Sequence, residues 1–398
     1  MRQQAPAWMV GMGHGATHWI AATFYLLIPY MREDLGFSYL EVGLLGSTFH
    51  VSSFLANFGS GMVVDVLGKR VAIQFLSLVV GAAALMLFGL AGGLVVLFVL
   101  VGLIGATNNL WHPAAISFLS GAFPKNRGYT LSIHTLGATM GDSLAPLCIG
   151  ALLAVMTWEK SALIGGIPVI VVALLIFTTL VRLDRDPEST TTRRISPGDY
   201  FRGLRDMFTD KAAMGLCLMA GFRSMAQNGL LVFVPLYLAD ILGFSPFYIG
   251  LSMTAMQIGG LVAGPAAGVV SDRIGRRPVV MMAVTATTLI ILLLALANNE
   301  IVFIGGVSML GFALFAMRPV LHSWMMDMTP LEMHGSATSA LFGVQSGLSF
   351  MIPALGGWVA DVYGIGSVFY LLAGFMIVAN VLVFMLPPPP RHDDETAA

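Results

Sequence analysis

Long apolar runs separated by short polar clusters make up most of this 398-residue chain. A helix needs roughly 20 apolar residues to cross a hydrocarbon core about 30 Å thick. The runs are continuously apolar rather than alternating with a period of two, which favours helices over barrel strands. We therefore predict an all-α membrane protein. Its twelve transmembrane helices are expected at about 7–31, 40–64, 71–91, 94–120, 129–156, 161–181, 212–238, 247–270, 278–297, 301–327, 336–360 and 366–386.

The longest polar stretch between these runs, 182–211, divides them into six and six. It contains Pro187, Pro197 and several Ser and Thr residues, a composition typical of a surface linker. We therefore predict four parts: an N-terminal six-helix bundle at 1–181, a cytoplasmic linker at 182–211, a C-terminal six-helix bundle at 212–386 and a cytoplasmic tail at 387–398.

The distribution of basic residues predicts the orientation, because Lys and Arg are enriched in cytoplasmic loops. With the N-terminus in the cytoplasm, nearly every Lys and Arg lies on the cytoplasmic side. Arg32 and Lys160 then lie outside, while Arg223 and Arg318 lie within predicted helices. Both chain termini are therefore expected in the cytoplasm.

Composition narrows the function classes. Only 10% of the residues are charged and 57% are hydrophobic, against about 25% charged in soluble proteins. The formal net charge of −1 leaves no basic footprint for nucleic acid. The two cysteines, Cys148 and Cys217, lie in apolar stretches and build neither a disulfide framework nor a Cys-rich metal site. A lipid bilayer is the expected surrounding.

The two halves repeat each other at an offset of about 207 residues. Leu35-Gly36-Phe37-Ser38 recurs as Leu242-Gly243-Phe244-Ser245, and His112-Pro113 corresponds to Arg318-Pro319. Because six helices and a linker return the chain to the same side, the halves are predicted to be parallel repeats about an axis along the membrane normal. Two such bundles would enclose a midplane cavity that opens to each side in turn.

A glycine-rich, charged loop follows the second predicted helix of each half. The first copy reads Gly61-x-x-x-Asp65-x-x-Gly68-Lys69-Arg70, and the second reads Gly268-x-x-x-Asp272-Arg273-Ile274-Gly275-Arg276-Arg277. Glycines permit a tight turn and close helix approach, and the Asp is placed to meet basic groups or a helix N-terminus across the bundle interface. We expect these residues to latch a cytoplasmic gate.

This loop resembles the signature of the major facilitator superfamily, although Val66 stands where a basic residue is usual. The resemblance covers all twelve predicted helices. It implies a secondary transporter whose cavity is lined by the first and fourth helices of each half. Within the fifth helix, the stripe Gly137, Gly141, Pro146 and Gly150 predicts close helix packing.

That stripe is similar to the glycine-proline motif of antiporters in the superfamily. With Trp111-His112-Pro113, it resembles the fosmidomycin-resistance branch, whose members are drug/proton antiporters. Ala114 stands here where an acidic residue often follows the His-Pro pair.

Ionisable residues within a membrane are costly and mark functional sites. Arg223 and Arg318 suit a bidentate anion such as a carboxylate or a phosphonate. The alternative is that each forms a structural ion pair with Asp142 or Asp327. Asn108, Asn109 and Gln227 are further candidate substrate-binding groups, with helix–helix hydrogen bonding as their alternative role.

Histidines supply a second set of candidates. His14 and His18 share one face of the first helix, and His112 lies in the fourth. We assign all three to substrate binding, and we assign His18, His112 and Asp142 to proton coupling. No resident metal or cofactor is predicted. The alternatives are a metal site at His14 and His18 or hydrogen bonding between helices.

The sequence therefore predicts a monomeric transporter in the cytoplasmic (inner) membrane. The leading hypothesis is proton-driven export of a small organic, anionic compound. Uptake of an organic anion, or transport of a metal ion or metal chelate through the histidines, are the alternatives. An enzyme or receptor is disfavoured because the chain has no His-Glu-x-x-His pair, Gly-x-Ser-x-Gly elbow or phosphate loop.

Overall fold

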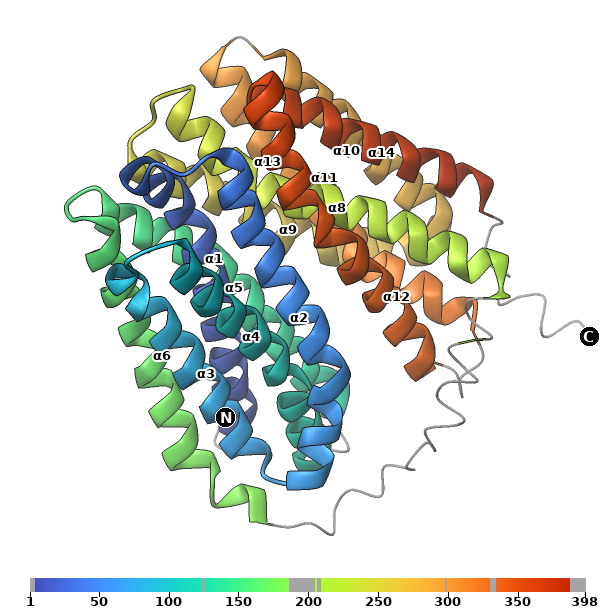
Figure 1. The fold of residues 1–398 in the computed structure, drawn as a ribbon. Helices are drawn as coiled ribbons and strands as arrows, with labels where there is room; N and C mark the ends of the chain where they lie inside the picture. The colour runs from blue at the N-terminus through green and yellow to red at the C-terminus, as the bar shows by residue number, and fades with distance from the viewer. Residues whose placement is uncertain are drawn as a thin grey trace, which may run out of the picture. The chain divides into compact units, whose positions relative to one another are not determined.

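The computed structural model describes residues 4–123, 126–185, 205, 209–297, 299–329 and 334–386. The described regular structure is helical, with short 3₁₀ turns at η2 (Leu87–Leu90) and η4 (Leu183–Arg185) (Figure 1). The first helices are α1 (Ala5–Leu35), α2 (Tyr39–Leu67), α3 (Arg70–Met86), α4 (Leu94–Ala122), α5 (Arg127–Leu153) and α6 (Trp158–Leu180). They are followed by α8 (Lys211–Asp240), α9 (Pro246–Ile274), α10 (Arg276–Leu296), α11 (Glu300–Asp327), α12 (His334–Ser349), α13 (Met351–Tyr363) and α14 (Gly366–Met385).

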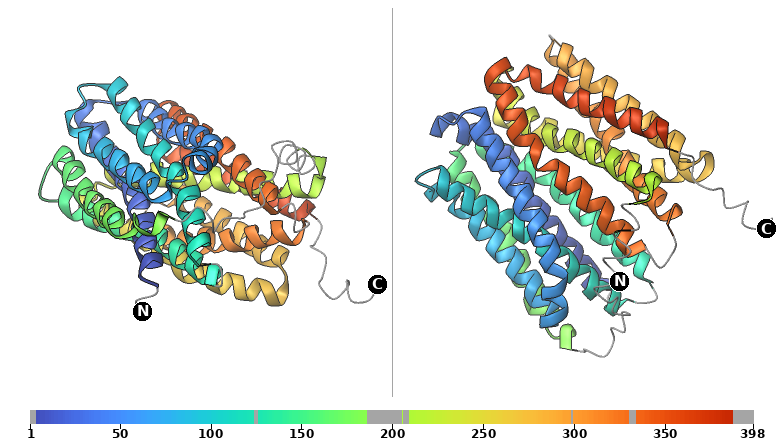
Figure 2. Two further views of the ribbon diagram at one scale, coloured as in Figure 1. Left: turned by 90° about the horizontal axis from the view of Figure 1, so that it is seen from below. Right: turned by 45° about the vertical axis from the view of Figure 1, so that its right-hand side comes forward.

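The chain forms two compact units. The first contains Met1–Thr192 and Val234–Thr254, and the second contains Arg193–Phe233 and Ala255–Ala398. In the first unit, α1 packs against α4, α5 and α6, while α2 and α3 pack on α4. In the second unit, α10 lies beside α11 and α14, as Figures 1 and 2 show. The predicted division at 182–211 stays a prediction.

Ten helical segments of the described chain are long and apolar enough to cross a membrane. Helices α1 and α2, at 31 and 29 residues, are also long but lie outside that set. The prediction of an all-helical protein is confirmed. The count of twelve spans and the cytoplasmic termini stay predictions.

One predicted helix, 336–360, is divided into α12 and α13 at Phe350. Pro353 explains the break, because it has no backbone N–H to donate to the carbonyl four residues earlier, and its ring collides with that carbonyl. The carbonyl in question belongs to Ser349, the last residue of α12.

Corresponding glycines end helices in both halves of the chain. Gly36 and Gly243 have φ values of +67° and +62°, and Gly68 and Gly275 have φ values of +62° and +95°. Each pair is separated by the predicted repeat offset. The left-handed backbone region is open to glycine without a steric penalty, so the repeated sequence encodes a repeated turn.

Candidate functional site

The seam between α1 and α5 positions His14, His18 and Asp142 in the first unit. A Cβ atom on Gly137 would overlap the carbonyl oxygen of Gly11, and one on Gly141 would overlap that of Gly15. Side chains larger than hydrogen are therefore excluded, and the two helix backbones approach closely. This contact brings the α1 residues that follow Gly11 against the middle of α5.

The rest of the glycine-proline stripe packs elsewhere within the first unit. A Cβ on Gly150 would lie 2.7 Å from the carbonyl oxygen of Pro246 and 3.1 Å from the Cα of Gly250. A Cβ on Gly250 would in turn overlap the carbonyl oxygen of Pro146. Glycine is thus required on both sides of this second close approach.

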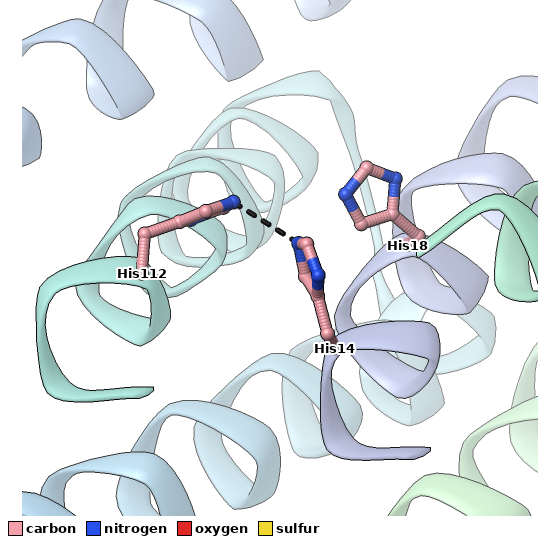
Figure 3. A group of neighbouring side chains, drawn as sticks. All are labelled: His14, His18 and His112. Carbon is pink, nitrogen blue, oxygen red and sulfur yellow. Dashed lines mark hydrogen bonds between the residues drawn. The ribbon is translucent and has the colours of Figure 1, made fainter. Parts of the chain in front are cut away.

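Three histidine side chains lie close together beside the α1–α5 seam. His14 and His18 come from α1 and His112 comes from α4, and Figure 3 shows their rings facing one another. One ring nitrogen of each lies within 4.8 Å of those of the other two. The Nε2 atoms of His14 and His112 are 3.2 Å apart. The prediction that His14 and His18 share a face agrees with this arrangement, and the fold adds His112 to them.

Each of these rings is held by an oxygen atom at Nδ1. His14 Nδ1 donates to the carbonyl oxygen of His134 over 2.7 Å, and His112 Nδ1 donates to that of Asn108 over 3.0 Å. His18 Nδ1 lies 3.0 Å from Oδ1 of Asp142 on α5. Asp142 is 124 residues from His18 in sequence, and this partnership was missed because only the fold brings α5 to α1.

His134 supports the cluster without joining it. Its ring stacks on that of His14 with centroids 3.7 Å apart, and its Nε2 accepts a hydrogen bond from Trp111 Nε1 over 3.3 Å. Trp111 is fully buried, and its indole packs where a Cβ on Gly13 would otherwise lie. Trp111 and His134 therefore fix the orientation of His14.

The two asparagines of α4 hold helices together. The Asn108 amide donates to the carbonyl oxygen of Thr17 over 3.4 Å, and the Asn109 amide donates to that of Ser53 over 2.8 Å. These contacts join α4 to α1 and to α2, which is the helix-bonding role that the sequence left as an alternative for both residues.

An apolar pocket borders the same seam. Its lining includes Trp8, Met12, Trp19, Leu136 and Met140. None of the lining residues has an ionisable side chain, so this pocket has the surface of a site for hydrocarbon rather than for an ion.

In the second unit, Arg223 lies inside the protein with an incomplete set of partners. Its side chain is 2% exposed. One terminal nitrogen donates to the carbonyl oxygen of Leu314 on α11 over 2.6 Å, whereas Nε has no partner among the described residues. Gln227, one turn along α8, is 5% exposed, and its Oε1 also lacks a partner in the part of the chain that the structure describes. Among the described residues, no carboxylate pairs with Arg223.

Arg318 is near Arg223 but is more exposed. Its guanidinium lies 5.3 Å from the centre of the Phe315 ring, and it is close enough to repel the charge of Arg223. The carboxylates that the sequence offered as counter-ions have other partners, since Asp142 contacts His18 and Asp327 contacts Arg276.

The second charged loop forms a network within its own unit. Arg276 pairs with Asp272 and, over 3.0 Å, with Asp327 at the end of α11. Arg277 donates to the carbonyl oxygen of Phe384 over 2.7 Å. Arg273 lies in the last turn of α9 and has an exposed side chain. The structure thus places Asp272, Arg276 and Asp327 in one ion-pair network within the second unit, and the role of Asp272 and Arg276 in a gate stays a prediction.

Only part of the first charged loop is described. The surroundings of Gly61 and the side chain of Asp65 are outside what the structure describes. Lys69 is the N-cap residue of α3 and Arg70 is its first residue. The Val71 N–H donates to Asp184 Oδ2 over 2.8 Å. Burial raises the pKa of Asp184, while the Val71 N–H and the Arg70 charge act in the opposite direction.

The glycines of these loops differ in what they do. Gly68 and Gly275 occupy turns with positive φ, whereas Gly268 lies inside α9. No described atom lies within 4 Å of the position that a Cβ on Gly268 would take. The close helix approach expected from the sequence is therefore not formed at Gly268 within the described part of the chain.

Comparison with known proteins agrees with this architecture. The glycerol-3-phosphate transporter of Bacillus subtilis is 23% identical over 94% of this chain and 89% of its own length. The fosmidomycin resistance protein of Escherichia coli is 21% identical over 97% and 93%, respectively.

Solved structures show the same fold. A bacterial homologue of the human lysosomal transporter Spinster, inward-facing and occupied, superposes with a TM-score of 0.80 at 16% identity, covering 96% of both chains. The nucleoside transporter NupG gives a TM-score of 0.79 at 15% identity over 96% of this chain and 99% of its own.

The sequence profile of the Major Facilitator Superfamily matches residues 9–237 and 216–398, which together include nearly all of the chain. With its many apolar helices, the protein is a multi-pass membrane protein and a transporter. The chain belongs to the Major Facilitator Superfamily.

Proposed function

We propose that this protein exports a small organic anion across the cytoplasmic membrane by alternating access, in exchange for protons. The observation that supports an anionic cargo most directly is the buried guanidinium of Arg223, whose Nε has no partner among the residues that the structure describes. Arg318 adds a second guanidinium beside it.

An uncompensated charge inside a membrane helix raises the free energy of the protein. An arginine in the middle of a membrane helix costs about 2.5–3.5 kcal/mol on insertion scales. A chain that keeps Arg223 with one carbonyl partner therefore gains from a ligand that supplies the missing negative charge. A carboxylate or a phosphoryl group matches the planar guanidinium with two parallel hydrogen bonds.

The names of several relatives point to the same chemistry. They include transporters of glycerol-3-phosphate and hexuronate, and a probable hexose phosphate transport protein. Phosphates and uronates are anions. The name of the fosmidomycin resistance protein supports export rather than uptake, and uptake of an organic anion remains the alternative.

Protons stay the predicted driving ion, with Asp142, His18 and His112 as the predicted coupling residues. The proposed cytoplasmic gate comprises Asp272 and Arg276, with the corresponding loop of the first half. We propose the monomer as the transporting species. Anion binding at Arg223 does not depend on the driving ion, the gate residues or the oligomeric state.

Flux into proteoliposomes tests the proposal. Phosphorylated and carboxylated compounds would be supplied under a pH gradient of either sign. Export predicts that the anion accumulates in the lumen only when protons move out of the lumen, toward the transporter's cytoplasmic side, in exchange. Arg223→Gln should abolish anion flux. The matched control is Arg182→Gln, an exposed arginine beyond the end of α6, which should leave flux unchanged. Equal flux in wild type and Arg223→Gln would refute the anion proposal.

A further inference from the structure

We propose that His14, His18 and His112 form a binding site for a divalent transition-metal ion of the zinc class. The site goes beyond the proposed anion transport and does not depend on it. Its three ligands belong to α1 and α4 in the first unit, whereas Arg223 and Arg318 belong to the second.

The hydrogen bonds at Nδ1 determine where the lone pairs of the rings lie. A carbonyl oxygen only accepts hydrogen bonds, so His14 Nδ1 and His112 Nδ1 must each carry a hydrogen to bond their carbonyl partners. In the neutral ring the other nitrogen, Nε2, then bears a lone pair and no hydrogen. Two lone pairs thus face each other across 3.2 Å. A cation between them satisfies both.

The separation of the two atoms suits a metal ion. Zinc lies about 2.0–2.1 Å from histidine nitrogens in tetrahedral sites, which places neighbouring ligand nitrogens roughly 3.3 Å apart. The His14 and His112 Nε2 atoms are 3.2 Å apart. A nitrogen of His18 completes a set of three within 4.8 Å, and Figure 3 shows the His18 ring directed toward the other two.

Asp142 orients His18 as a metal ligand through a contact to the second nitrogen of its ring. It contacts His18 at Nδ1 and leaves Nε2 of that ring for the metal. Metal-bound histidines commonly donate their second N–H to a carboxylate or a backbone carbonyl, which orients the ring and raises its basicity. All three rings here have such a partner: the His134 carbonyl, the Asn108 carbonyl and the Asp142 carboxylate.

The ligand set selects the class of ion. Three imidazoles favour zinc, cobalt, nickel or copper, whereas magnesium and calcium prefer oxygen ligands. Three protein ligands also leave a fourth coordination position for water or for a donor atom of a cargo molecule. His134 is excluded as a ligand because its Nε2 accepts the Trp111 hydrogen bond.

Metal binding to purified protein tests this site without any transport assay. The protein should carry a tag without histidines and be studied in detergent or nanodiscs. We expect one Zn²⁺ per chain by titration calorimetry, and a tetrahedral visible absorption spectrum with Co²⁺. Because the imidazoles must be deprotonated to bind metal, affinity should fall as the pH is lowered.

Variants separate this site from other histidines. His14→Ala, His18→Ala and His112→Ala should each weaken zinc binding at least as much as Asp142→Asn, for which about a 10- to 100-fold loss is expected from the loss of ring support. His50→Ala is the matched control, because His50 is a helix histidine bonded to the Tyr25 hydroxyl outside the cluster. It should bind zinc as wild type does.

Two outcomes would overturn the proposal: no zinc binding by folded wild-type protein, or undiminished binding by the variant lacking all three histidines. Where an alanine variant does not give monodisperse protein, His112→Gln and Asp142→Asn provide the same comparison. Arg223→Gln should bind zinc normally, so a failure of the anion proposal leaves this measurement unaffected.

Discussion

Gly137 on α5 lies so close to Gly11 on α1 that a methyl group on Gly137 would overlap the Gly11 carbonyl oxygen. The same seam carries His14 and His18 toward α5, where His134 and Asp142 bond their rings. Helix packing and site geometry therefore depend on the same glycine contacts, and substitution of these glycines should affect both.

Gly137→Ala should destabilise the protein by about 1–3 kcal/mol, the usual cost of overpacking a close contact. Thermal unfolding in detergent would measure it. Gly128→Ala is the control on the same helix, because no described atom lies within 4 Å of the position that its Cβ would take. It should unfold at the wild-type temperature or slightly above. If the two variants unfold alike, the close contact does not stabilise the fold.

Arg223→Met separates a structural role from a functional one. Replacing an unpaired buried charge by an apolar side chain of similar length removes a desolvation penalty. We expect the unfolding temperature to stay the same or rise, while anion flux is lost. A marked drop in stability would instead assign Arg223 to holding the fold through the Leu314 carbonyl.

Asp142→Asn should uncouple transport from the proton gradient, because the amide keeps the shape of the side chain but cannot exchange a proton. Anion exchange between equal internal and external pH should persist, whereas accumulation against a concentration gradient should cease. Proteoliposome flux with and without a pH gradient distinguishes these. Gradient-driven accumulation by the variant would reject Asp142 as the coupling residue.

Asp184→Asn should alter the pH dependence of stability. Burial raises the pKa of Asp184 in the folded protein, so folding favours its protonated form. The stabilisation that Asp184 contributes is therefore fully present below the pKa of the unfolded state. It is lost as the pH rises through the pKa of the folded state. The neutral Asn side chain can still accept from the Val71 N–H.

Thermal unfolding at several pH values would measure this effect. We expect Asp184→Asn to unfold at a higher temperature than wild type at pH 7, and we expect the difference to shrink toward pH 4. A variant less stable than wild type at pH 7 would show that the Arg70 charge and the Val71 hydrogen bond outweigh the burial of the carboxylate.

The apolar runs alone were sufficient to predict a helical membrane protein, because hydrophobic length and continuity follow directly from residue order. The repeat could also be predicted from the sequence, and its paired glycines Gly36 and Gly243 end helices with positive φ. The break at Phe350 was not predicted, although the local effect of Pro353 explains it.

The residue types of the candidate sites were likewise present in the sequence, since arginine, histidine and aspartate are rare within apolar runs and conspicuous there. Only the tertiary structure decided their partners. His14 meets His112 across 98 residues, and His18 meets Asp142 across 124. Such contacts depend on how each helix is rotated and how closely its neighbours approach. Glycine pairs on different helices determine that approach jointly, so neither helix specifies it alone.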